Sequence, residues 1–501
     1  MQARSVCRFS CRIIVLSLHH LNFILRAAVT LNQNIYAKDP MTYSSTIVCA
    51  TLLLSSIVSA IHAEGQRPPN IVVIISDDQG YADHTFNPQH TPEVNTPNLE
   101  ALARSSVVFS QAYVTGNVCS PSRLGLLSGR YPQRCGVYTA GEGGKGLPVS
   151  DPLCPTLFPT YIKPAGYTSM AFGKWHLGLE VELSPAARGF DDFYGFLGRG
   201  GHDYYKLSEP DNPLYRGLKP ISDSGYLTTR LTQEAVKFIQ EKKANPFFVY
   251  LAYNAVHSPA EAPAEDIARI RAKFPDLTPE RAILAAMIEH LDHGIGSVVK
   301  TLKDEGLYDN TLLFFLTDNG GSKSMGAINT PLRGFKQEHY EGGIRTPFFV
   351  SWPKRFAGGR VIDTPVISLD ILPTAISAAN LPMPTTTILD GQSLLPLIEG
   401  KADAMPRNFF WSEGGETGEY AIRSDNWKLI GFPDRQELYN LSADPFEKNN
   451  VIKDHADQVT TLYAVYDAWL TTMANPMKGG PKKWVAGAAD PKKNKKPKKE
   501  E

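Results

Sequence analysis

The chain has 501 residues, with 51 acidic and 51 basic side chains and therefore a formal net charge of zero at neutral pH. This length accommodates one large domain with a smaller one, or two to three ordinary domains. The charge is uneven: residues 1–63 carry +4, residues 64–480 carry −9 and residues 481–501 carry +5. Because nucleic-acid binding needs a basic face, the acidic body argues against nucleic acid as a partner.

The first 63 residues contain a candidate export signal. Residues 47–60 form an apolar and small-residue run that leads into Ile61, His62 and Ala63, as in a signal peptide with its cleavage site. We expect residues 41–63 to be a signal peptide and residues 1–40 a mis-assigned extension, although the segment after Met41 lacks Lys and Arg. The predicted product is secreted or periplasmic, without a stable membrane span. A short uncleaved anchor is the alternative.

Two predicted core strands end in oxygen-bearing side chains. The β-branched run 70–76 is typical of a strand buried on both faces, and it is followed by Asp77 and Asp78. The run 310–317 is a similar strand, followed by Asp318 and Asn319. Ligands collect at the carboxyl ends of such strands, and hard oxygen donors suit Ca²⁺ or Mg²⁺. We predict a divalent-cation site, whereas Asp77 and Asp78 taken alone would be read as a turn with a helix cap.

The segment 117–130, Asn-Val-Cys-Ser-Pro-Ser-Arg-Leu-Gly-Leu-Leu-Ser-Gly-Arg, places a thiol next to a predicted helix. Pro121 suits the first turn of a helix, so Cys119 is expected just ahead of a helix N-terminus. That position favours an activated nucleophile and an anionic substrate. The alternative is a buried structural cysteine. Cys135 and Cys154 are the other cysteines beyond the leader, and the sequence leaves open whether they are bridged.

Further polar side chains follow other predicted strands. Lys174 and His176 come after the strand 168–172, and His257 comes after the strand 245–253. Lysine and histidine at strand ends are placed to meet an anion. An aromatic loop over 190–205 suggests His202 and Tyr204 as contacts to a sugar or aryl group, although simple loop packing explains the same residues.

The other predicted helices and strands divide the chain into a large main domain and a small C-terminal subdomain. Helices are predicted at 97–104, 156–163, 224–243, 279–305 and 365–379, strands at 106–109 and 348–351, and a glycine-rich loop at 141–146. Beyond Lys401, short strands at 409–411, 419–424, 427–432 and 437–440 precede a helix at 456–473. We therefore expect a main domain over 64–402, a C-terminal α+β subdomain over 403–476 and a disordered Lys-rich tail over 477–501.

Several blocks resemble the type I, formylglycine-dependent sulfatases of the alkaline phosphatase-like superfamily. The blocks are Asp77 to Gly80, Cys119 to Arg130, Gly173 to Gly178, Asp318 to Gly321, Leu332 to Pro347 and Leu438 to Pro445. Around Lys336 the sequence Phe-Lys-Gln departs from the Gly-Lys-Gly expected of the family. The resemblance implies an α/β fold in which helices sandwich a large mixed, mostly parallel sheet, with a smaller C-terminal antiparallel sheet and helix.

The resemblance also implies residue roles. A sulfatase-maturing enzyme oxidises the family's cysteine, here Cys119, to formylglycine, whose hydrated aldehyde is the nucleophile. Asp77, Asp78, Asp318, Asn319 and modified Cys119 correspond to ligands of a divalent cation, usually Ca²⁺. Arg123, Lys174 and His176 correspond to residues around the hydrate, and His257 and Lys336 to residues facing the sulfate and the ester oxygen.

The expected function is hydrolysis of sulfate monoesters, with sulfated carbohydrate favoured over a soluble aryl sulfate. Two alternatives remain at this point. A phosphomonoester or phosphonate hydrolase would use the same scaffold, because phosphate and sulfate share shape and charge. A secreted protein that binds sulfated glycans without hydrolysing them would keep the same charged positions.

Overall fold

The core of the protein is a ten-stranded mixed sheet. The computed structural model describes residues 67–198, 200–401, 406–413 and 418–476, so the predicted leader 1–63 and tail 477–501 lie outside the described residues. In spatial order the strands are β11 (Arg360–Ile362), β2 (Val107–Phe109), β10 (Phe348–Ser351), β9 (Thr311–Thr317), β1 (Asn70–Ser76), β8 (Phe247–Ala252), β4 (Thr168–Lys174), β5 (Asp192–Phe196), β6 (Leu214–Arg216) and β7 (Lys219–Ile221).

The middle of this sheet is parallel. β1 pairs in parallel with both β9 and β8, and β4 pairs in parallel with β8 and β5. β10 runs antiparallel to β9, and β6 and β7 form an antiparallel edge. The carboxyl ends of β9, β1, β8 and β4 therefore share one edge of the sheet, and the segments that follow these strands begin side by side.

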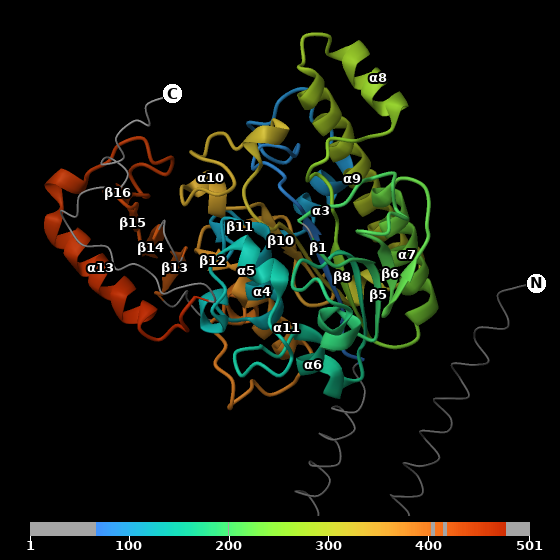
Figure 1. Cartoon of the computed structure of the whole chain (residues 1–501), viewed down its shortest axis with the longest axis horizontal. Helices are drawn as coiled ribbons and strands as arrows, with labels where there is room; N and C mark the ends of the chain where they lie inside the picture. Colours follow the sequence, from blue (N-terminus) through green and yellow to red (C-terminus); the bar gives the residue numbers. More distant parts are fainter. Residues whose placement is uncertain (1–66, 199, 402–405, 414–417, 477–501) are drawn as a thin grey trace, which may run out of the picture. The chain divides into compact units, whose positions relative to one another are not determined.

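Alternate residues of β1 face opposite helical layers. Ile71, Val73 and Ile75 belong to a core formed with α4 (Cys119–Ser128), α6 (Phe158–Ile162), α11 (Ile371–Ala378) and α12 (Leu395–Ile398). Val72 and Ile74 belong to a second core formed with α3 (Pro97–Arg104), α7 (Leu227–Lys242), α8 (Ala264–Lys273) and α9 (Pro279–Asp304). This burial on both faces explains the continuous apolar run of β1, and Figure 1 shows α4, α6 and α11 grouped in front of the sheet.

The C-terminal part is a four-stranded antiparallel sheet covered by one helix. The strands β13 (Asn408–Ser412), β14 (Tyr420–Ser424), β15 (Trp427–Gly431) and β16 (Gln436–Asn440) pair in chain order, and α13 (Ala456–Leu470) packs on them. Trp411 anchors this sheet to the main body, because its indole N–H donates to the carbonyl of Val114 at 2.7 Å. A two-stranded sheet of β3 (Ala112–Tyr113) and β12 (Val366–Ile367) lies beside this contact. The α/β fold class predicted from the sequence is confirmed.

A buried ion network also joins α10 to the C-terminal sheet. α10 (Glu341–Ile344) begins with Glu341, whose carboxylate accepts from the ammonium of Lys428 at 2.9 Å. The same ammonium lies 2.7 Å from a carboxylate oxygen of Glu447, and all three side chains are buried. Two carboxylates thus share one cation at the base of the loop that precedes α10.

Three local predictions were wrong. The segment 141–146, expected as a loop, lies mostly in the short helix α5 (Ala140–Lys145), which is capped by Thr139 and Glu142. Part of the aromatic segment expected as loop is the sheet strand β5, and the helix expected from residue 365 starts only at Ile371 after a strand and a 3₁₀ turn. Cys135 and Cys154 are free thiols, so the bridge that the sequence left open is not formed.

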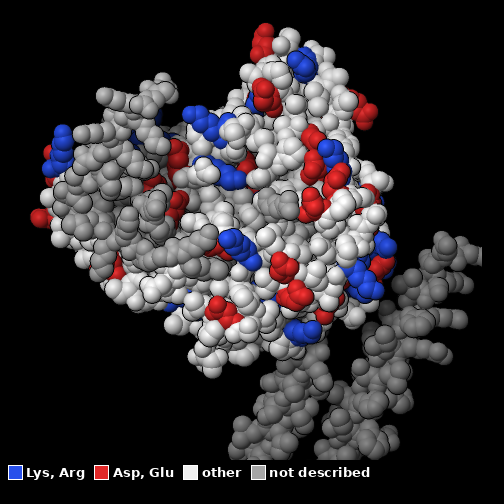
Figure 2. Space-filling view, in the orientation of Figure 1, with Lys and Arg blue, Asp and Glu red and all other residues white. Residues whose placement is uncertain are grey.

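Two further observations concern the charge of the surface and the hydropathy of the long helix α9. On the face seen in Figure 2, acidic and basic side chains are interspersed. Among the described residues, α9 is the one helix long and apolar enough to cross a membrane. Because 67% of its most apolar window is buried inside the protein, α9 is accounted for as a core helix.

Candidate active site

Four oxygen-bearing residues meet at the carboxyl edge of β1 and β9. Asp77 and Asp78 follow β1, and Asp318 and Asn319 follow β9; all four are buried. The backbone N–H of Asp78 donates to the carboxylate of Asp318 at 3.4 Å, and the side-chain amide of Asn319 donates to the carboxylate of Asp78 at 2.8 Å. The parallel register of β1 and β9 brings these two distant segments together, as the sequence predicted.

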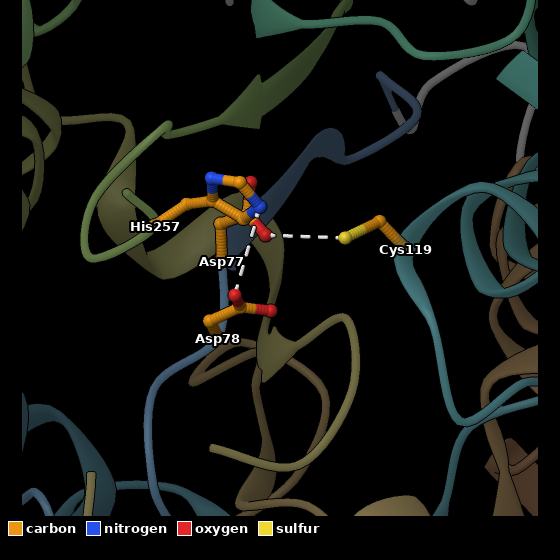
Figure 3. A group of neighbouring side chains, drawn as sticks. All are labelled: Asp77, Asp78, Cys119 and His257. Carbon is orange, nitrogen blue, oxygen red and sulfur yellow. Dashed lines mark hydrogen bonds and ion pairs between the residues drawn. The ribbon is translucent and has the colours of Figure 1, made fainter. Parts of the chain in front are cut away.

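Cys119 joins this group from the other side. It is the first residue of α4, so the helix begins at the cysteine rather than after it. Its Sγ lies 3.5 Å from Oδ1 of Asp77, and Figure 3 shows the thiol pointing toward that carboxylate. Ligand atoms of Asp77, Asp78, Cys119 and His257 all lie within 4.8 Å of one another. The nucleophile candidate and the acidic cluster therefore belong to one site.

Three cationic side chains surround the carboxylates. The ammonium of Lys174 donates to Asp77 at 2.5 Å, and that of Lys336 donates to Asp78 at 2.8 Å. The guanidinium of Arg123 lies 2.8 Å from Asp318 and 3.4 Å from Asp77. Buried charges are tolerated only when they are paired, so this density of opposite charges indicates a built site.

The donor set fits a divalent cation. Oδ1 of Asn319 is buried without a hydrogen-bond partner, although the amide nitrogen of the same side chain makes two hydrogen bonds. A buried carbonyl oxygen without a donor is costly unless a cation or water satisfies it. With the neighbouring aspartate carboxylates, it forms the oxygen-rich set that Ca²⁺ and Mg²⁺ take.

Two histidines flank Cys119 and the aspartates. His257 follows β8, and its Nε2 lies 3.6 Å from Asp78. Figure 3 marks this contact with a dashed line. His176 follows β4, and its carbonyl accepts from the hydroxyl of Ser120, the residue after Cys119. The Nδ1 of His176 is buried without a hydrogen-bond partner. Nδ1 of His176 is therefore free to exchange a proton or a hydrogen bond with a bound substrate.

Burial and neighbouring charges set the protonation of the site. Burial, with the charges of Lys174 and Arg123, holds the pKa of His176 well below its usual range, so the ring is neutral. Burial, with the carboxylates of Asp318 and Asp77, raises the pKa of the Cys119 thiol, so the unmodified side chain is protonated. Burial acts to lower the pKa of Lys336, but the carboxylates of Asp78 and Asp77 raise it above its usual range, so the ammonium stays charged.

Left-handed backbone conformations mark three positions of the site. Asp78, His176 and Gln337 have positive φ values of 61°, 59° and 75°. Residues other than glycine adopt this region at a cost, and such strain gathers at functional sites. Asp and His adopt this region more often than most other residues, but the sequence does not show which Asp or His does so.

The glycine-rich segment that we expected to be a surface loop packs against the site. A Cβ at Gly143 would come within 2.0 Å of the hydroxyl of Ser120, and a Cβ at Gly144 within 3.0 Å of Nε2 of His176. Both glycines lie in α5 and are buried. The Thr139-x-x-Glu142 pattern is a capping box, which is typical of a helix N-terminus, and it could have predicted α5 from the sequence.

The structure gives His202 and Tyr204 a different place from the one predicted. Both side chains are buried, and the imidazole nitrogens of His202 lie 2.7 Å from the carbonyls of Asp203 and Asn212. The hydroxyl of Tyr204 donates to the carbonyls of Asn254 and His257. The hydroxyl of Tyr204 supports the loop that carries His257, and a substrate contact by either residue stays a prediction.

Comparisons with known proteins agree with this fold and site. The sulfatase family model matches residues 69–381, and the model for the C-terminal part of N-sulphoglucosamine sulphohydrolase matches residues 335–467. The N-acetylgalactosamine-6-sulfatase of Mus musculus is 32% identical over 410 residues, which are 75% of this chain and 76% of that protein. Arylsulfatase J of Mus musculus is 31% identical and covers 77% of this chain and 73% of its own length.

A solved structure gives the same result. The crystal structure of Ps i-CgsB in complex with k-i-k-neocarrahexaose has 33% identity and a TM-score of 0.76, and the match covers 82% of this chain and 94% of that one. The fold and the charged site thus define a hydrolase of the alkaline phosphatase-like superfamily. More narrowly, the chain belongs to the sulfatase family and is a sulfuric ester hydrolase.

Proposed function

We propose that the protein hydrolyses sulfate monoesters of carbohydrates, with Cys119 converted to formylglycine and a Ca²⁺ ion bound beside it. The observation that carries the proposal is the convergence at one sheet edge: the Sγ of Cys119 lies 3.5 Å from Asp77, among three cationic side chains. A sulfate ester is an anion, so attack on it needs this neutralising charge.

Each charged residue has a physical role in this reaction. Lys174 and Arg123 hold positive charge beside residue 119, where the nucleophile and the sulfate oxygens meet. Lys336 and His257 lie on the Asp78 side of Cys119 and can give a proton to the departing oxygen. The neutral, buried His176 can accept one. The chain thus supplies both an acid and a base.

Two groups beyond the twenty amino acids complete the proposal. When present, the hydrated aldehyde of formylglycine supplies a nucleophilic hydroxyl and a second hydroxyl for release of sulfate. Asp77, Asp78, Asp318 and Asn319 would hold the Ca²⁺, which supplies further positive charge to the sulfate oxygens. The unpartnered Oδ1 of Asn319 supports this ligand set.

The substrate class is supported by the relatives. The mouse relative at 32% identity is named for N-acetylgalactosamine 6-sulfate, and the Ps i-CgsB structure holds an oligosaccharide. A phosphonate monoester hydrolase of Agrobacterium radiobacter shares the fold at 20% identity and a TM-score of 0.58. This likeness concerns the fold alone, so we favour sulfate over phosphate or phosphonate.

The test compares Cys119→Ala with the wild type. We expect sulfate release from aryl sulfates and sulfated oligosaccharides to fall by roughly 10³-fold or more, as when a nucleophile is removed. Cys154→Ala removes a thiol that lies outside the site and should leave turnover unchanged. Mass spectrometry of the active enzyme should find the aldehyde or its hydrate at position 119. Active enzyme carrying only the thiol would falsify the proposal.

The same preparation separates the remaining alternatives. A phosphatase would release phosphate from aryl phosphate faster than sulfate from aryl sulfate. A glycan-binding protein without activity would bind sulfated oligosaccharides and release no sulfate. We further propose export through residues 41–63, which N-terminal sequencing of the mature protein tests; a mature chain that retains residues before Met41 contradicts it.

A further inference from the structure

A second group of metal-ligating side chains lies where the Lys336 loop meets the C-terminal sheet. It consists of His339, Glu413 and Glu419, each of which offers one ligand atom, and these atoms all lie within 4.8 Å of one another. His339 precedes α10, whereas Glu413 directly follows β13 and Glu419 directly precedes β14. Figure 1 labels these elements. The group shares no residue with the active site described above.

The two glutamates form the next pair of the β13–β14 ladder. Ser412 pairs with Tyr420, so Glu413 lies opposite Glu419, and the backbone N–H of Glu413 donates to the carbonyl of Glu419 at 2.8 Å. Like charges directly opposite each other destabilise an antiparallel pair. Among the described residues, no Lys or Arg forms an ion pair with Glu419. A cation between the carboxylates would remove this repulsion.

The imidazole of His339 supplies the second, independent observation. The residue is 2% exposed, and its Nδ1 is buried without a hydrogen-bond partner. Nδ1 lies 3.8 Å from Oε2 of Glu419, which is too far for a hydrogen bond. Two ligands of one tetrahedral ion, each about 2.1 Å from the metal, are separated by roughly 3.4 Å. The spacing therefore fits two ligands of a shared ion better than a direct contact.

We propose that His339, Glu413 and Glu419 bind a divalent transition-metal ion, with Zn²⁺ as the favoured ion. One imidazole nitrogen and two carboxylate oxygens suit Zn²⁺, whereas Ca²⁺ takes oxygen ligands only. The side chain of Glu419 is 25% exposed, which leaves room for water as a fourth ligand. The ion is distinct in chemistry from the oxygen-bound cation beside Cys119.

The position of this ion suggests a stabilising role for the loops of the active site. The side-chain amide of Asn117 donates to Glu413 at 2.6 Å, and the carbonyl of Asn117 accepts from the N–H of Gln337. Asn117 lies two residues before Cys119, and Gln337 directly follows Lys336. A metal at His339 would therefore fix the C-terminal hairpin against both loops, without touching the substrate.

The experiment measures Zn²⁺ and Co²⁺ binding by the full-length protein at saturating Ca²⁺, in the Cys119→Ala background to remove the active-site thiol. We expect one equivalent to bind and bound Co²⁺ to show the visible absorption of a site with a nitrogen ligand. His339→Ala and Glu419→Gln should each weaken binding by roughly 10- to 100-fold or more, because even loss of an outer partner costs that much. His455→Ala, which removes an exposed imidazole beside Trp427, is the matched control and should bind normally.

Two outcomes would overturn the proposal. One is Zn²⁺ affinity that is unchanged in both variants, which would assign the metal to another site. The other is absence of binding at micromolar Zn²⁺, which would leave His339 packed beside the glutamates without a metal. Glu419→Gln alters a partly exposed side chain, so it remains informative if His339→Ala does not fold. Anomalous diffraction at the zinc edge should place the ion at bonding distance from Nδ1 of His339.

Discussion

Tyr204 contributes to the site through a buried hydroxyl that holds the loop carrying His257. It donates to the carbonyls of Asn254 at 3.0 Å and His257 at 2.9 Å, and the residue is fully buried. Tyr204→Phe leaves both carbonyls without this donor, so the free energy of unfolding should fall by about 1–3 kcal/mol. Because the backbone at His257 is then less constrained, kcat should fall as well. Chemical denaturation and steady-state kinetics measure the two effects.

The neighbouring tyrosine provides the control for this prediction. Tyr205 is 47% exposed, and Tyr205→Phe should change neither stability nor kcat. Unchanged kcat in Tyr204→Phe, together with the expected loss of stability, would limit Tyr204 to a structural role. A raised KM at unchanged kcat would instead restore the direct substrate contact that the sequence predicted.

Gly144 sets the space available to His176. A Cβ at Gly144 would come within 3.0 Å of Nε2 of His176, so Gly144→Ala should displace the imidazole and lower kcat by about tenfold or more. The free energy of unfolding should change little, because the gain in helix propensity and the cost of moving the buried imidazole oppose each other. Gly141→Ala on the same helix, where the nearest atom is 4.0 Å away, is the matched control. Equal kcat in the two variants would contradict the assignment.

At the residue scale, the sequence predicted the site from polar side chains that directly follow buried strands. Asp77, Asp78, Asp318 and Asn319 were predicted together because parallel strands end at one edge, and the structure brings them into contact. The supporting role of Tyr204 was not predicted, because its acceptors are two backbone carbonyls that only the folded loop places within reach. The roles of the catalytic residues stay predictions until the variants are measured.

At the element scale, the contact between α10 and β15 depends on the protonation of Glu447, which shares Lys428 of β15 with Glu341 of α10. Burial raises the pKa of Glu447 to about 7; Lys428 opposes this rise and Glu341 adds to it. Between pH 4.5 and pH 7 the folded protein therefore holds a proton that the unfolded chain has released. The free energy of unfolding should fall as the pH rises through this window, by up to about 3 kcal/mol from this group.

Glu447→Gln tests this coupling. The neutral amide has no proton to release, so the variant should lose less stability than the wild type between pH 4.5 and pH 7. Glu241→Gln, at an exposed position of α7, should follow the wild-type curve. Urea unfolding at a series of pH values gives the comparison. Parallel curves for the wild type and Glu447→Gln would show that Glu447 is already ionised in the folded protein.

Elements with a clear periodicity were predicted well, and those whose form depends on neighbours were not. The buried runs of β1 and β9 and the apolar stripe of α9 gave their type and nearly their bounds. β5 was missed because its aromatic and glycine residues carry no alternation, and it is a strand through its pairing with β4. β12, two residues long, exists through pairing with β3, and no pattern of that length predicts a strand.

At the scale of the whole molecule, the active site joins parts of the chain that are far apart in sequence. Asp77, Cys119, Lys174, His257 and Asp318 reach one edge because β1, β4, β8 and β9 are neighbours and α4 begins beside them. The cost of gathering three aspartates is reduced by Lys174, Arg123 and Lys336, which pair with them. The metal-free protein should therefore remain folded, although several carboxylates lie close together.

This balance predicts how the whole protein responds to Ca²⁺. A cation bound by Asp77, Asp78, Asp318 and Asn319 joins the ends of β1 and β9, so it should stabilise the folded state in proportion to ln(1 + [Ca²⁺]/Kd), or about 2.7 kcal/mol at a hundredfold excess over Kd. Calorimetry of the protein treated with a chelator and then titrated with Ca²⁺ measures the rise in Tm. Asp318→Asn should flatten the dependence, because the variant loses a charged ligand that also pairs with Arg123. A Tm that is independent of Ca²⁺ in the wild type would mean that the chain's own cations already satisfy the cluster.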